Sequence, residues 1–201
     1  MAKQRIEYID AMRGLTMILV VAYHVAQMSF GINEKTSTSL PFLVLFRMPL
    51  FFFISGFLAY KAAQVWSLGT LKTLLLKKLR VQVIPTLVFF TLFIAVTYKT
   101  FGASWLSHWN TPTKDGYWFT IVLLYMFVIY YIFAYVESKL KVRSWIPITA
   151  LFVLSLCAYE TCYLPRYFSW AMGYRGELNH FILNSSLRQL MFFFPFFVFG
   201  G

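Results

Sequence analysis

The chain has 201 residues, of which 60% are hydrophobic, 21% aromatic and only 12% charged. Soluble domains usually have about 25% charged residues, so this composition excludes an ordinary water-exposed globule. The net charge of +11 is typical of membrane topology signals and of attraction to anionic lipid. It does not indicate a nucleic-acid partner, because no strand-like pattern of arginines and aromatic residues accompanies it.

Long apolar runs predict membrane-spanning helices, since about 20 apolar residues cross about 30 Å of hydrocarbon. The runs are residues 12–30, 40–60, 81–98, 117–135, 145–164 and 187–200. The last run is too short to span, so we interpret the chain as an incomplete bundle. The sequence therefore predicts an all-α, polytopic transmembrane helical bundle with about six spans, forming one domain over residues 1–201.

The distribution of basic residues predicts the orientation of these spans. Most of the 18 Lys and Arg residues fall on the inner side if the N-terminus is cytoplasmic, as the positive-inside rule requires. Glu7 and Asp10 interrupt the basic region that a signal peptide needs, so the first run is expected to remain as a helix. We therefore expect a multi-pass protein of the cell (inner, cytoplasmic) membrane.

The first run carries two basic side chains, Arg13 and His24. They are 11 residues apart, and 11 steps of about 100° leave them about 20° apart on one helix face, about 16 to 17 Å along the axis. Asp10 lies on the same face. One interpretation is a snorkelling arginine and a histidine that bonds a neighbouring helix, and the other is a functional pair.

The second run places Arg47 about 10 Å below the outer membrane boundary, at a depth similar to that of His24. A charge there is costly unless it faces a partner or a polar cavity, so a functional role is the default hypothesis. Glu160, near the outer end of the fifth run, is the acidic candidate for the partner of this charge. The alternative is that Glu160 simply lies at the water interface. Ser55 and Gly56 predict close helix packing.

Four basic residues precede the third run: Lys72, Lys77, Lys78 and Arg80. Lys77 and Arg80 are three residues apart and share a helix face. Their role is either topological or that of an anion clamp for phosphates. Two outer loops, 99–116 and 165–186, contain aromatic residues of an interfacial belt or of a sugar-stacking surface. Cys157 and Cys162 have no metal-like spacing, so no metal site and no disulfide framework are predicted.

Several motifs together resemble the acyltransferase-3 family of membrane acyltransferases. Its first helix carries an arginine or lysine, ten intervening residues and a histidine, as Arg13 and His24 do. The likeness extends to IDAMRGL, MPLFFFISGF, the Lys77-x-x-Arg80 pair followed by Pro85, GYWF and FPFFVFGG. Two positions depart from the family pattern: Arg47 stands where many relatives have histidine, and Lys77 begins the basic pair.

The resemblance implies transfer of an acyl group, commonly acetyl, from cytoplasmic acyl-coenzyme A to a hydroxyl of a saccharide or lipid-linked saccharide. It implies His24 as the base or nucleophile. Arg47 and Glu160, singled out by their depth in the membrane, are further catalytic candidates. The coenzyme-binding candidates are Arg13, Lys77, Lys78 and Arg80. Membrane lipid is expected as a further partner, and nucleic acid is not. Whether the protein forms a homo-oligomer is left open by the sequence.

The alternative hypothesis is a proton-coupled transporter or flippase of a saccharide-type or anionic substrate. In that case His24 and Glu160 relay protons and Arg47 holds the substrate. The basic inner cluster favours the enzyme, because a transporter has no need of a phosphate clamp one coenzyme arm away from its histidine.

Overall fold

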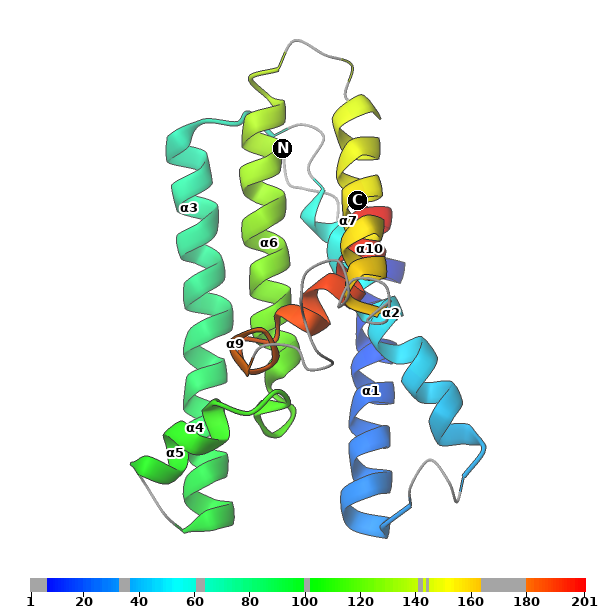
Figure 1. The fold of residues 1–201 in the computed structure, drawn as a ribbon, viewed down its shortest axis with the longest axis vertical. Coiled ribbons are helices and arrows are strands. Elements are labelled where there is room, and N and C mark those ends of the chain that lie inside the picture. Colours follow the sequence, from blue (N-terminus) through cyan, green and yellow to red (C-terminus); the bar gives the residue numbers. More distant parts are fainter. Residues whose placement is uncertain are drawn as a thin grey trace. The chain divides into compact units, whose positions relative to one another are not determined.

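The computed structural model describes residues 7–32, 37–60, 64–99, 102–140, 143, 145–163 and 180–201. All regular elements in these ranges are helical (Figure 1), which confirms the predicted all-α class. The chain forms two compact units. The first consists of residues 1–61 and 196–201, and the second of residues 62–195.

Three helical segments in the described ranges are long and apolar enough to cross a membrane, judged by length and composition. They are Ser39–Ala59, Leu68–Tyr98 and Trp118–Glu137, and two shorter apolar helices are Trp145–Glu160 and Leu187–Gly200. Helix α1, Glu7–Phe30, has 24 residues but is not one of these three. Membrane-spanning potential is therefore confirmed for three of the six predicted runs. The other spans and the cytoplasmic N-terminus stay predictions.

In the first unit, α1 packs against α2, Ser39–Ala59. The buried residues of α1 recur every three to seven positions, so they form one stripe along the helix. They are Ile9, Thr16, Val20 and Tyr23. Helix α2 continues through Pro49, which lies two residues after Arg47 and removes one backbone donor from the helix.

Two glycines allow the end of α10, Leu187–Gly200, to approach α2 at backbone distance. A Cβ atom added to Gly56 would lie 1.9 Å from the carbonyl oxygen of Phe197, and one added to Gly200 would lie 2.0 Å from that of Phe53. The two contacts pair the helices in antiparallel register. The hydroxyl of Ser55 donates to the carbonyl of Phe51 at 2.8 Å. The predicted packing role of Ser55 and Gly56 is confirmed for Gly56.

The Gly56→Ala variant is expected to lower the free energy of unfolding by about 1–3 kcal/mol, because the new methyl group forces two backbones apart. Gly14→Ala is the matched control, since nothing lies within 4 Å of a Cβ added at Gly14. Thermal unfolding in detergent measures both variants. Equal unfolding temperatures for the two would contradict the close approach.

A single long helical segment dominates the second unit. It joins α3, Leu68–Lys78, a π-helical turn η1, Leu79–Val83, and α4, Ile84–Tyr98 (Figure 1). Ser67 caps its start by accepting a hydrogen bond from the Thr70 amide at 3.1 Å. The sequence predicted a span only from residue 81. The helix begins earlier because the wide π turn accommodates Pro85 without ending it.

Helix α6, Trp118–Glu137, runs alongside this long segment in the second unit (Figure 1). The Lys78 ammonium lies 3.3 Å from the centroid of the Phe127 ring. The side-chain amide of Gln82 in the π turn donates to the carbonyl of Thr120. These contacts bind the basic end of the long helix to α6.

The remaining elements of the second unit are two short α-helices, one 3-10 turn and the longer helix α7. They are α5, Ala103–Trp109, the 3-10 turn η2, Lys114–Gly116, α7, Trp145–Tyr163, and α9, His180–Asn184. The predicted outer loop 99–116 thus contains one short α-helix and one 3-10 turn. Most of the other predicted outer loop, residues 164–179, lies outside the described residues.

Candidate functional site

Three side chains of the first unit form a cluster where α1 packs against α2. Arg47 of α2 exposes only 9% of its surface, and its Cζ atom lies 3.4 Å from the centroid of the Tyr23 ring. The rings of Tyr23 and His24 meet edge to face, with centroids 5.6 Å apart. His24 and Arg47 thus both contact the ring of Tyr23. The structure therefore brings together the two basic residues that the sequence placed at similar depth.

The chemistry of this cluster depends on the two nitrogens of His24. Its Nδ1 atom is buried and has no hydrogen-bond partner among the described residues. A buried polar atom without a partner is costly, and in native structures it often marks a catalytic role or a bound group. Gln27 donates to the Tyr23 hydroxyl at 2.7 Å, which fixes the ring against Arg47. The cluster can therefore offer a proton acceptor beside a fixed cation.

Arg13 is exposed near the N-terminal end of α1, the helix that also carries His24. Because α1 is uninterrupted from Glu7 to Phe30, the predicted spacing of about three turns between the two residues is retained. The side chain of Asp10, predicted to orient Arg13, lies outside the described residues.

Lys77 and Arg80 line one side of an open hollow of about 300 Å³ on the long helix of the second unit. Its other lining residues are Thr73, Leu76 and Val81. The predicted shared face of the basic pair is therefore confirmed. Lys78 instead contacts Phe127 of α6, so its ammonium does not join the hollow.

The predicted site residues thus fall into two groups, one in each unit. His24 and Arg47 lie together with Tyr23 in the first unit, to which Arg13 also belongs, and Lys77 and Arg80 lie together in the second. Glu160 is exposed on α7 of the second unit. A single site that joins both groups stays a prediction.

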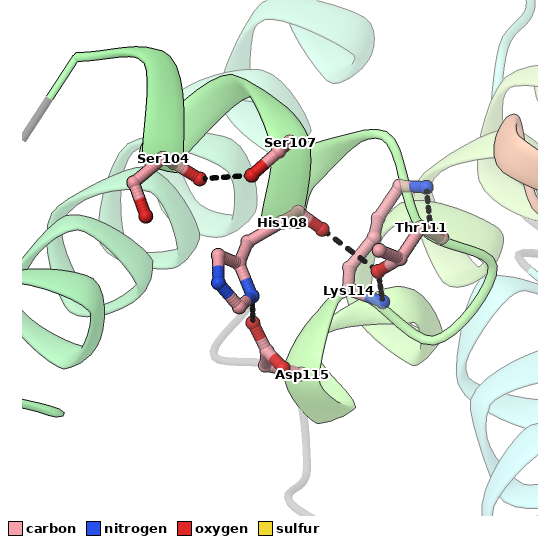
Figure 2. Close-up of polar contacts among 6 residues, drawn as sticks. All are labelled: Ser104, Ser107, His108, Thr111, Lys114 and Asp115. Carbon is pink, nitrogen blue, oxygen red and sulfur yellow. Dashed lines mark hydrogen bonds and ion pairs between the residues drawn. The ribbon is translucent and has the colours of Figure 1, made fainter. Parts of the chain in front are cut away.

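Two further features of the structure are not among the predicted site residues. The first is Tyr23, which directly precedes His24 and lies four residues before Gln27, the spacing at which two side chains meet on a helix. The second is the contact of His108 with Asp115, whose Nδ1 and Oδ2 atoms lie 2.8 Å apart in the loop after α4 (Figure 2). The two residues lie on opposite sides of a turn, which no periodic pattern marks.

The apolar helices indicate a helical membrane protein, in which Arg47 is a buried cation. A family model for an acyltransferase domain matches residues 6–201, nearly the whole chain. No curated protein and no solved structure matches the chain significantly. The chain belongs to the acyltransferase-3 family of membrane acyltransferases.

Proposed function

We propose that this protein transfers an acyl group, in the simplest case acetyl, from cytoplasmic acyl-coenzyme A to a hydroxyl of a saccharide or lipid-linked saccharide in the cell (inner) membrane. Family membership supports acyl transfer. The observation that carries the proposal is the half-buried His24, whose buried Nδ1 atom has no hydrogen-bond partner among the described residues, beside the buried cation of Arg47. A structural histidine inside a helix pair would be expected to use both ring nitrogens.

In the proposed reaction, His24 accepts the proton of the acceptor hydroxyl as a general base. The hydroxyl oxygen then bonds to the carbonyl carbon of the thioester. The carbon–sulfur bond breaks, and the coenzyme thiolate takes up the proton that His24 received. Arg47 stabilises the negative charge that develops on the carbonyl oxygen, because its guanidinium is already fixed against Tyr23 and needs little reorganisation.

The donor end of the proposed site rests on the hollow beside Lys77 and Arg80. Coenzyme A carries a pyrophosphate and a 3′-phosphate, and ammonium and guanidinium groups bind phosphate through charge-assisted hydrogen bonds. Arg13 is proposed as a further phosphate ligand. Lys78 contributes charge from its place against Phe127, so we expect it to matter less than Lys77.

The proposal is tested by adding coenzyme A that carries a labelled acetyl group to native membranes that contain the protein. We expect the label to move to a saccharide fraction, and to fail to do so in membranes that lack the protein. Uptake or export of a saccharide without any transfer of label would contradict the proposal and favour a transporter.

The Lys77→Ala and Arg80→Ala variants are each expected to weaken coenzyme A binding by about tenfold or more, because each removes a charge-assisted contact. The loss should shrink as salt rises and screens the exposed charges. Lys72→Ala is the matched control, since Lys72 is an exposed lysine of α3 that does not line the hollow. Calorimetry measures the affinities. Equal affinities for all three variants would refute the clamp.

A further inference from the structure

The loop after α4 holds a histidine in a defined orientation. The Nδ1 atom of His108 on α5 lies 2.8 Å from Oδ2 of Asp115 on η2 (Figure 2), and the two side chains keep 24% and 23% of their surfaces exposed. An ionised carboxylate can only accept hydrogen bonds, so Nδ1 must carry the hydrogen. In the neutral imidazole Nε2 then has a free lone pair that can accept a hydrogen bond from a hydroxyl.

One aromatic ring packs directly on this imidazole. The ring of Tyr98, at the end of α4, lies against His108 with centroids 4.0 Å apart at an interplanar angle of 32°. On the same short helix, Trp105 and Trp109 stack with centroids 5.4 Å apart. The Trp105 indole N–H donates to the Thr91 hydroxyl at 3.0 Å. The imidazole is therefore held by the Tyr98 ring as well as by Asp115, whereas the two indoles pack against Phe90 of α4.

The backbone that presents Asp115 is strained. Lys114 and Asp115 have φ values of 44° and 48°, and a left-handed conformation costs a non-glycine residue about 1–3 kcal/mol. The Lys114 ammonium donates to the carbonyl of Thr111 at 3.1 Å and to that of Asn184. Burial lowers the pKa of Lys114, so holding this ammonium inside the loop adds a further cost.

Further contacts hold the strained turn against the start of α10 and the residue before it. The Gln189 side chain donates to the carbonyl of Pro112 at 3.1 Å, and the Ser186 hydroxyl reaches the same oxygen at 3.5 Å. Strain that the surrounding structure maintains in this way is concentrated at functional sites. A loop that only connected two helices could relax these two residues at little cost.

We infer that Nε2 of His108 binds a hydroxyl of the saccharide acceptor on the outer side of the membrane, with Asp115 as its positioning residue. The inference rests on the proposed acyl transfer and on the proposed orientation, which places residues 99–116 outside. The Tyr98 ring beside the imidazole adds an apolar surface of the kind that a sugar ring can contact. A hydroxyl-bearing saccharide therefore fits this site better than an anion, which Asp115 would repel.

Two substitutions of His108 separate this role from that of a hydrogen bond to Asp115 that only stabilises the loop. The side-chain amide of asparagine places a donor where Nδ1 stands, so His108→Asn keeps the contact with Asp115 but removes Nε2. The amide of glutamine reaches the position of Nε2, so His108→Gln keeps an acceptor there and loses the contact with Asp115. Each variant is made in the protein in its native membrane, with labelled acetyl-coenzyme A as the donor.

We expect His108→Asn to reduce transfer of label to saccharide by about tenfold, the effect of one lost hydrogen bond in the site. Its unfolding temperature and its affinity for acetyl-coenzyme A should match those of the wild type, and His108→Gln should retain more transfer than His108→Asn. Wild-type transfer by His108→Asn would overturn the inference while leaving the proposed function intact. A wild-type protein that moves no label would instead refute the proposed function, and with it this inference.

Discussion

The His24→Ala variant is expected to lose acyl transfer by a factor of about 10² to 10⁴, the usual contribution of a general base. The Nδ1 atom of His24 is buried and has no hydrogen-bond partner among the described residues. Alanine has no atom that could accept the proton of the acceptor hydroxyl. Transfer of label from acetyl-coenzyme A measures the loss. Membrane insertion and coenzyme A binding should stay close to the wild type, because the phosphate ligands are proposed to lie elsewhere.

The matched control is Val25→Ala, which changes the next residue of α1. Val25 is 43% exposed, so its truncation should leave the packing against α2 and the rate of transfer nearly unchanged. If His24→Ala turned over like Val25→Ala, the catalytic role of His24 would be wrong. If His24→Ala instead stopped coenzyme A binding, His24 would be a donor-binding residue.

Features that depend on one helix could be predicted from the sequence, because helical periodicity is local. Arg13 and His24 share a face as long as α1 is continuous, and Lys77 and Arg80 share theirs through the start of the π turn. The contact of Arg47 with Tyr23 depends on how α1 and α2 cross. Residue spacing indicates depth along each helix, but it does not show which side chain of the neighbouring helix is met.

Two further features show where local patterns fail. Gly56 was predicted to allow close packing, but its partner is Phe197, more than a hundred residues away along the chain, and no spacing rule joins them. The turn at Lys114 and Asp115 has left-handed backbone at residues other than glycine. Tertiary contacts to Asn184 and Gln189 maintain that conformation, so the sequence of the loop alone could not predict it.

The helix that contains the third predicted span begins before the apolar run. The run from residue 81 predicts the span, but it does not show how far the helix extends into the basic segment before it. The helix continues because Leu and Lys are favourable helix formers and because the π turn removes the clash that Pro85 would cause. The basic pair therefore lies on a continuous helix, which suits a binding site that needs fixed geometry.

The last prediction concerns Arg47, where we expect Arg47→Lys to insert normally and to lose most of its turnover. The guanidinium is planar and lies over the Tyr23 ring at 3.4 Å. It can stack there and still direct N–H groups at a developing oxyanion. An ammonium on a flexible stem is a point charge that does not hold this orientation. The rate of label transfer, compared at equal amounts of inserted protein, measures the effect.

Arg47→Leu separates catalysis from stability at the same position. Leucine removes the charge altogether, so transfer should fall at least as far as in Arg47→Lys. Its unfolding temperature should stay near that of the wild type, because burying a guanidinium carries a desolvation cost that offsets the lost stacking on Tyr23. Full transfer by Arg47→Leu would show that the cation only packs α2 against α1. In that case His24 would act as the base without Arg47, and no side chain of α2 would stabilise the oxyanion.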